Sequence, residues 1–392
     1  MRSATFLLLL VLLLTTACGD ADPVDPAAAP TVEVTYPATD RWPAERAREY
    51  YAARPRPVGA NYNNRDAINQ LEMWQAETFA PEQIDEELGW AAAAGMNSMR
   101  VYLHNLVWEA DSAAYLDRIE RYLDIAAGHG ISTTFVLFDA VWDPVANLGD
   151  QPEPRPRVHN SGWVQSPASR QLMNGERYYP EARNYVQGIL RHFADDDRVF
   201  MWDLYNEPDN DNFGKFPNEP ANKADFVYPL LVNTFRWARA VNPSQPLTAG
   251  VWFGDLFNAT GAGKPLNRFN KFQLENSDII SYHHYRDTTH HKQILDILAT
   301  YERPLVCTEY VARTHGSDFV GTLPLLARRD VGAYNWGLVA GKTNTIYPWA
   351  SWDSTFTAEP HLWHHDVFRP DGTAYSEEEI TVLQAAGDSA TR

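Results

Sequence analysis

The sequence predicts an α/β fold in which eight parallel strands alternate with helices to form a (β/α)8 barrel. Eight runs of five to eight residues are apolar or aromatic, and longer amphipathic stretches separate them. Most of these runs are apolar on both faces, which is typical of parallel strands covered by helices. A regular alternation of such strands with helices favours a barrel.

The expected strands span residues 57–61, 98–103, 132–138, 199–205, 247–253, 279–284, 305–309 and 333–339. The expected helices span 81–94, 112–127, 179–193, 226–241, 292–301 and 318–329. The first of these helices begins with Pro81 and acidic residues and ends at Gly95, as helix termini commonly do. An open, doubly wound sheet is the alternative, but the segment VGANYNNRD at the first strand lacks a glycine-rich phosphate turn.

Two long segments, 142–177 and 341–363, follow the third and eighth strands and are rich in Trp or Pro. Both should lie at the carboxyl ends of the strands, where barrel enzymes keep their sites. If they close one end of a groove, they would favour short substrates or chain ends. Residues 41–392 are expected to form one barrel domain, with 340–392 completing and wrapping it.

The first 17 residues read as a signal peptide, because Arg2 precedes an apolar run of nine residues. Cys18 follows Thr-Thr-Ala and resembles the lipidated cysteine of a bacterial lipoprotein, although Leu14 lies one position further back than usual. Residues 18–40 are rich in Pro, Ala and Asp and read as a flexible tether. We expect an exported bacterial protein, lipid-anchored at the cell envelope or else periplasmic or secreted.

The formal net charge of −18 argues against nucleic acid as a partner and against a basic membrane-binding patch. The 13 Trp and 19 Tyr residues indicate either an aromatic-lined cleft or a large aromatic core. We expect a monomer that needs no cofactor. Membrane contact is expected only through the lipid.

Two glutamates fall at the ends of expected strands: Glu207 after the fourth strand, and Glu309 at the end of the seventh. Strands of a barrel end at one mouth, so both carboxylates should point into it. Such a pair can divide the work of acetal cleavage, one donating a proton and the other attacking the sugar carbon. The alternative for a single buried glutamate is an ion pair with arginine.

The motifs W-D-L-Y-N-E-P, at 202–208, and T-E-Y, at 308–310, resemble those of clan A glycoside hydrolases, and most of all glycoside hydrolase family 5, the cellulase family. The resemblance covers about residues 55–345. It implies a retaining hydrolase of β-glycosidic bonds, with Glu207 as general acid/base and Glu309 as nucleophile. Retention requires carboxyl groups about 5–5.5 Å apart.

The resemblance also implies substrate-binding roles. Asn206 would contact the sugar 2-hydroxyl, Arg100 would hold the nucleophile, and Trp336 would form the floor under the reacting sugar. His283 and Tyr285 match the His-x-Tyr pair of the family. Many members carry a histidine after the third strand, where this chain has Asp139; His104 is expected to fill some of that space. The substrate is expected to be a β-glucan, xylan or mannan of plants or algae.

Other functions remain open from the sequence. A glycan-binding lipoprotein without activity could use the same cleft, and a transglycosylase could use the same carboxylates. No H-E-x-x-H motif is present, so no metal site is expected, and the His pairs at 283–284, 290–291 and 364–365 lie in separate segments. The absence of G-x-S-x-G disfavours a serine esterase. Cys307 is expected to be a buried packing residue.

Overall fold

The computed structural model describes residues 40–252 and 266–391. The expected signal peptide (1–17), Cys18 and, except for Asp40, the expected tether (18–40) lie outside the described residues. So does the end of the expected fifth strand, Phe253.

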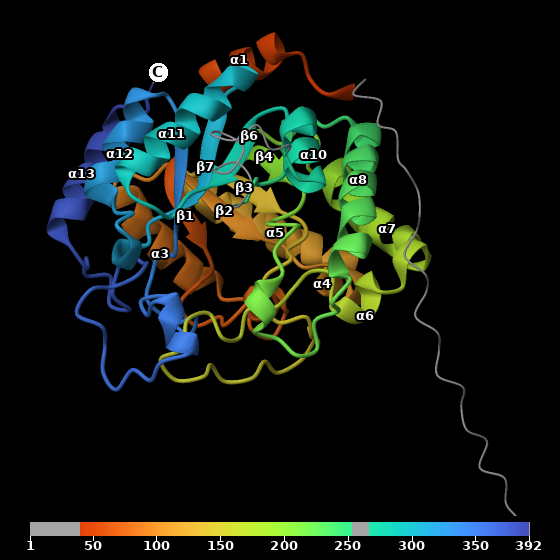
Figure 1. Ribbon diagram of the computed structural model, residues 1–392, viewed down its shortest axis with the longest axis horizontal. Coiled ribbons are helices and arrows are strands. Elements are labelled where there is room, and N and C mark those ends of the chain that lie inside the picture. Colours follow the sequence, from red (N-terminus) through yellow and green to blue (C-terminus); the bar gives the residue numbers. More distant parts are fainter. Residues whose placement is uncertain (1–39, 253–265, 392) are drawn as a thin grey trace, which may run out of the picture.

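Eight parallel strands form one sheet, in the order β5-β4-β3-β2-β1-β8-β7-β6 (Figure 1). They are β1 (Val58–Tyr62), β2 (Ser98–Tyr102), β3 (Ser132–Val136), β4 (Val199–Asp203), β5 (Leu247–Thr248), β6 (Ile280–His283), β7 (Leu305–Tyr310) and β8 (Gly332–Trp336). Val251, just past β5, forms a parallel bridge with Tyr282 of β6, which closes the sheet into a barrel. The predicted (β/α)8 barrel is confirmed, and the open doubly wound sheet is wrong.

Helices cover the outside of the barrel. They are α1 (Ala44–Ala52), α2 (Gln70–Trp74), α3 (Pro81–Ala93), α4 (Asn105–Ala110), α5 (Ser112–Gly128), α6 (Ser169–Leu172), α7 (Tyr179–His192), α8 (Lys223–Val241), α10 (Arg268–Asn276), α11 (Thr288–Leu298), α12 (Phe319–Arg328) and α13 (Glu377–Asp388). The six predicted helices are present, with ends shifted by a few residues. Short 3-10 turns are η2 (Gly175–Tyr178), η3 (Asn212–Gly214), η4 (Ala299–Tyr301), η5 (Arg313–His315) and η6 (Trp349–Trp352).

Side-chain caps explain two helix boundaries. The expected helix at 292–301 begins earlier, at Thr288, because the Asp287 side chain accepts from the N–H groups of Thr289 and His290. The last helix, α13, begins after Ser376, whose side chain accepts from Glu379 N–H. The three glutamates in its first turn stabilise the helix, because their negative charges lie near the positive end of the helix dipole.

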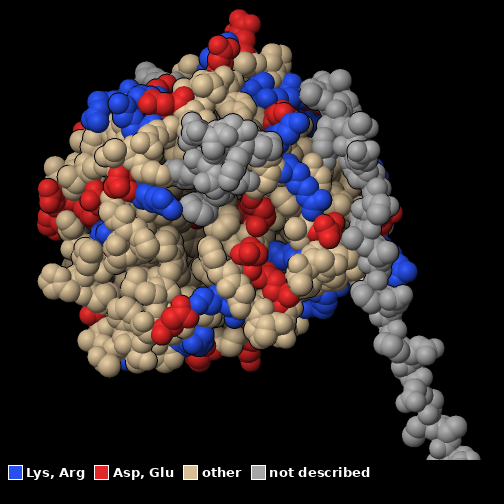
Figure 2. All heavy atoms as spheres, in the orientation of Figure 1, with Lys and Arg blue, Asp and Glu red and all other residues tan. Residues whose placement is uncertain are grey.

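The long segments after β3 and β8 run side by side at the bottom of Figure 1, in yellow and blue. The short elements α6 and η2 lie at the end of the first of these segments, and η6 lies within the second. Figure 2 shows charged side chains of both signs spread over the same face of the molecule. Uncharged side chains gather at its lower left, over the segment after β8, where residues 343–352 carry no charge. Among helices of the described ranges, none is long and apolar enough to cross a membrane.

The interior of the barrel is filled by stacked polar and aromatic side chains. Near the amino ends of the strands, Tyr334 Oη lies 2.8 Å from Ser98 Oγ and 2.9 Å from Thr134 Oγ1. The next layer toward the mouth holds Arg100, which is fully buried. The centre of the barrel is therefore a solid support for the groups at its mouth.

Substitution of Gly59 in β1 tests the tight pairing of β1 with β2. A Cβ placed at this position would lie 1.6 Å from the Ser98 carbonyl oxygen. We expect Gly59→Ala to lower the free energy of unfolding by about 3 kcal/mol or more, since the backbone must shift. Urea denaturation measures the change. Gly128→Ala is the matched control, because no atom lies within 4 Å of its Cβ position. An equal effect of the two substitutions would contradict the pairing.

Candidate active site

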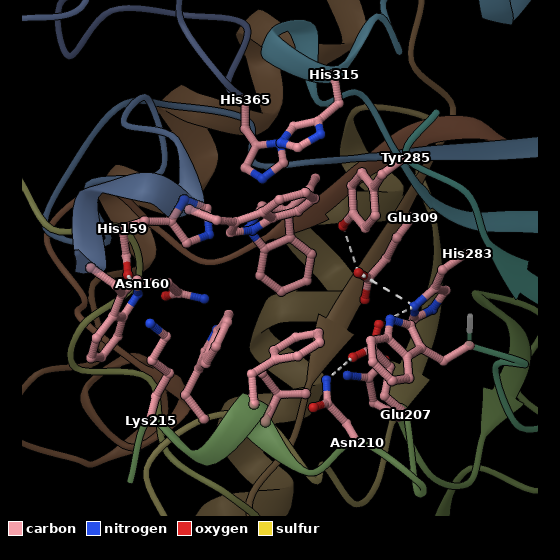
Figure 3. A pocket seen from close by; sticks show the side chains of 18 of the residues that line it. His159, Asn160, Glu207, Asn210, Lys215, His283, Tyr285, Glu309, His315 and His365 are labelled. Carbon is pink, nitrogen blue, oxygen red and sulfur yellow. Dashed lines mark hydrogen bonds and ion pairs between the residues drawn. The ribbon is translucent and has the colours of Figure 1, made fainter. Parts of the chain in front are cut away.

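Three side chains from different strand ends meet at the mouth of the barrel: Glu207 after β4, His283 at the end of β6 and Glu309 in β7 (Figure 3). One carboxylate oxygen of each glutamate and one ring nitrogen of His283 all lie within 4.8 Å of one another. Glu207 has a φ of 43°, in the left-handed region, and Val311, just after β7, has a φ of 68°. Such backbone strain is concentrated at functional sites.

Glu309 accepts hydrogen bonds at both carboxylate oxygens. Tyr285 Oη donates to Oε2 at 2.6 Å, while Tyr102 Oη and Arg100 Nη1 donate to Oε1 at 2.9 and 3.0 Å. Burial raises the pKa of Glu309, and nearby His283 and Arg100 act in the opposite direction. These donors fix the orientation of the carboxylate and stabilise its ionised form.

Glu207 is held by fewer groups. Its Oε1 lies 2.7 Å from Nδ1 of His283, and its Oε2 accepts from Asn210 Nδ2 at 2.6 Å. Burial raises the pKa of Glu207 to about 8, with the Asn210 hydrogen bond acting in the opposite direction. Burial also lowers the pKa of His283 to about 4, so this imidazole is neutral near pH 7. Glu207 is therefore suited to carry a proton at neutral pH.

Arg100 connects the nucleophile candidate to the rest of the site. Its Nε and Nη2 donate to Asp203 Oδ2 at 3.1 and 2.8 Å, and its Nη1 donates to Asn61 Oδ1 at 2.7 Å. Its Nη2 also donates to Asn206 Oδ1 at 2.7 Å. The guanidinium does not line the cavity; it lies beneath Glu309 and holds that side chain in place.

Asp139, where the resemblance leads one to expect histidine, orients Asn206. Its carboxylate accepts from Asn206 Nδ2 at 2.9 Å, Trp163 Nε1 at 2.7 Å and Val141 N at 3.0 Å. Burial raises the pKa of Asp139 to about 7. Because Oδ1 of Asn206 accepts from Arg100, the orientation of the amide is fixed. The amide nitrogen has two N–H groups, so one remains for a ligand in the cavity that Asn206 lines.

The site opens into a cavity of about 560 Å³. Five half-buried tryptophans line it: Trp142, Trp252, Trp336, Trp349 and Trp352. The ring of Trp336 rests edge-on against Tyr102 and Trp163, with centroids 5.8 Å apart in both pairs. An aromatic-lined cleft, which the composition left open, is therefore present.

Of the predicted site residues, six line the cavity: Asn206, Glu207, His283, Tyr285, Glu309 and Trp336. His104 does not, and its ring is used within the protein. Its Nδ1 accepts from Leu106 N at 3.1 Å, and its Nε2 lies 3.1 Å from the Gln165 carbonyl oxygen. Burial lowers its pKa to about 3. His104 therefore caps α4 and holds the segment after β3, in place of the expected position in the binding space.

Sequence reasoning missed Tyr102, Asp203 and Asn210. Tyr102 could have been found, because it follows Arg100 by two residues and so points to the same face of β2. Asp203, on β4, is a carboxylate within an apolar run, which also marks it as unusual. Asn210 gave no such signal, because it lies in a polar turn. Among the other histidines, His291 is buried against Tyr282, and His364 and His365 are buried. Cys307 is buried too, as expected.

Glu207, His283 and Glu309 are close enough together to hold a metal ion. The positive charge of Arg100, which contacts Glu309 at 3.0 Å, disfavours a cation there. Both oxygens of Glu309 are also already used by hydrogen-bond donors. The arrangement fits proton transfer and nucleophilic attack better than metal binding.

No protein-family model matches the chain, and no curated protein matches it in sequence. Solved structures share its fold. An exo-β-1,4-mannosidase from Opitutaceae bacterium strain TAV5 has a TM-score of 0.57 at 18% identity, covering 91% of this chain and 63% of that one. A GH5_18 protein from Streptomyces cattleya, in complex with GlcNAc, has a TM-score of 0.53 at 11% identity, covering 86% and 80%. An endo-1,4-β-mannanase from Rhizomucor miehei has a TM-score of 0.52 at 13% identity, covering 86% and 99%.

The chain therefore has the barrel fold of these glycoside hydrolases, as the sequence resemblance implied. At such low sequence identities the structural similarity shows a shared fold, and the function must be inferred from the residues of the site.

Substitution of Asn210 tests its hydrogen bond to Glu207. Its amide hydrogen bond favours the ionised carboxylate, so we expect Asn210→Ala to raise the pKa of Glu207 above its value of about 8. A carbon NMR titration of labelled glutamate carboxyl groups measures it. Asn276→Ala is the control, because that amide donates to Phe272 O within α10. A lower pKa in Asn210→Ala would contradict the assigned contact.

Proposed function

We propose that the protein is a retaining glycoside hydrolase that cleaves β-linked glycans. The observation that carries this proposal is the pair Glu207 and Glu309, with carboxylate oxygens within 4.8 Å at the mouth of the barrel. Such a separation fits the 5–5.5 Å between carboxyl groups of retaining enzymes, since inverting enzymes need about 6.5–9.5 Å to fit a water between them.

The different surroundings of the two carboxylates support their roles. Glu309, which accepts from three donors including Arg100, is the nucleophile that attacks the anomeric carbon. Glu207, with a pKa raised to about 8, carries the proton that it gives to the leaving oxygen. Glu207 then removes a proton from water, which attacks the anomeric carbon and releases Glu309.

Sugar binding is assigned to the aromatic and amide groups. The ring of Trp336 lines the same cavity as Glu309 and Asn206 and can stack on a sugar ring. The free N–H of Asn206 is placed to bind the 2-hydroxyl of that sugar, a contact that strengthens in the transition state. The substrate is a β-glucan, xylan or mannan type of chain; proteins of like fold include β-mannanases and a β-mannosidase, so β-mannosides come first in a test.

Glutamate substitutions test the proposal on aryl β-glycosides and β-linked oligosaccharides. We expect Glu207→Ala to lower kcat about 10²–10⁴-fold on oligosaccharides. On a dinitrophenyl glycoside, whose leaving group needs no proton, Glu207→Ala should still release a burst of phenolate. Glu309→Ala should release none, because no covalent intermediate can form.

Proton NMR of the first product distinguishes the stereochemical outcome, and the β-anomer is expected. Glu275→Ala, an exposed glutamate on α10, serves as the control and should keep wild-type rates. The α-anomer as first product would overturn retention. Full activity of Glu309→Ala would overturn the assigned nucleophile.

Substitution of Asp139 tests whether its carboxylate orients the Asn206 side chain for substrate binding. In Asp139→Asn a neutral amide replaces a carboxylate that accepts four hydrogen bonds, one of them from Asn206, so the contact that orients the Asn206 amide is weakened. We expect kcat/KM to fall roughly tenfold to hundredfold, since one charge-assisted hydrogen bond is lost. On a matched 2-deoxy glycoside, which lacks the contacted hydroxyl, the loss should be much smaller. Equal losses on both substrates would mean that Asp139 acts only on the structure.

A further inference from the structure

The segments after β3 and β8 are joined to each other along one side of the cavity. His159, after β3, donates from its backbone N to Ser351 Oγ at 2.9 Å, and its Nδ1 lies 2.8 Å from the Tyr347 carbonyl oxygen. Trp352 Nε1 donates back to the His159 carbonyl oxygen at 2.8 Å. The rings of Trp142 and Trp352 stack, with centroids 5.8 Å apart and planes at 24°.

A third segment, after β4, joins them. Lys215 Nζ lies 2.6 Å from Asp353 Oδ1, and both residues line the cavity. The ring of Phe216 packs edge-on against Trp352, with centroids 5.4 Å apart. We call these joined residues, Trp142, His159, Lys215, Phe216, Trp352 and Asp353, the end wall. Within the described ranges, no residue of the segments 63–75 or 103–110, which follow β1 and β2, lines the cavity.

The end wall lies away from the carboxylate pair. In Figure 3, His159, Asn160 and Lys215 occupy one end of the cavity, and Glu207, His283 and Glu309 the other. The ring of Trp336 contacts Trp163, which belongs to the segment after β3, the same segment that contributes Trp142 and His159 to the end wall.

The proton donor decides which part of a substrate faces the wall. The leaving oxygen must lie beside Glu207, whose partner His283 adjoins Gly250, two residues past β5. A Cβ on that glycine would lie 2.9 Å from His283 Nε2. The leaving part of the chain therefore extends over β5 and β6, where Trp252 and Arg286 line the cavity. The sugar attacked by Glu309 lies over Trp336 on the other side and continues toward the end wall.

We propose that the end wall makes this protein cleave from the non-reducing chain end, releasing one or two sugars at a time. This inference rests on the proposed hydrolase function. The glycosidic C–O bond breaks and the leaving oxygen takes the proton of Glu207. Water then supplies hydroxyl to the anomeric carbon, and its other proton returns to Glu207. In a chain cut internally, sugars beyond those over Trp336 and the neighbouring tryptophans would have to pass through the joined segments.

The test uses hexasaccharides of β-1,4-linked mannose, glucose and xylose, each labelled at the reducing end. For any hexasaccharide that wild type cleaves, the first labelled products should be five or four sugars long. Labelled fragments of three or fewer sugars among the first products would overturn the inference. Aryl β-glycosides are assayed in parallel, so hydrolysis of these with internal cleavage of the hexasaccharide overturns the chain-end inference alone. Absence of any hydrolysis overturns the proposed function, and this inference with it.

Trp352→Ala tests the end wall itself, because it removes the stacking on Trp142 and the hydrogen bond to His159. We expect the share of internal cleavage to rise about fivefold to tenfold, as for a loss of roughly 1–1.4 kcal/mol of discrimination. Trp237→Ala is the matched control: this half-buried tryptophan of α8 packs on Tyr179 at 5.8 Å, on the outside of the barrel. It should leave the product pattern unchanged. An unchanged pattern in a folded Trp352→Ala protein would contradict the role of the wall.

Discussion

The site depends on one buried cation, the guanidinium of Arg100. It binds Asn61 from β1, Asp203 from β4 and Glu309 from β7, so a single group fixes three strands relative to its own. A buried charge is tolerated only when it is paired and hydrogen-bonded, and here two carboxylates and two amide oxygens satisfy that demand. The same contacts that compensate the buried charge also set the positions of Glu309 and Asn206 at the mouth of the barrel.

The two glutamates at the mouth share one poorly solvated space, yet their partners differ in kind. Around Glu309 the donors are an arginine and two tyrosines, all of which favour a negative charge. Glu207 contacts a neutral imidazole and one amide, which compensate the burial of a charge much less. The proposed distinction between a nucleophile and a proton donor thus rests on the groups that contact each carboxylate, since the two side chains are identical.

The strands could be predicted from the sequence because buried parallel strands are apolar on both faces, and the two glutamates because they terminate two such strands. The role of His104 could not, since it depends on the chain turning into α4 directly after β2. The contact of Asp139 with Asn206 and Trp163 joins three distant segments, and no local pattern encodes it. The sequence did indicate that the segments after β3 and β8 were long, whereas their mutual hydrogen bonds depend on tertiary packing.

The proposed chain-end cleavage against the end wall has a consequence for the order in which ligands enter and leave the site. A ligand held against the end wall would leave by the opening through which the next chain arrives. The departing fragment over β5 and β6 would then have to clear the opening first, which would impose an order on release. A polymer could not be threaded through such a site, so each cycle would begin with a new encounter between chain and protein, and free short sugars would compete for the same entrance.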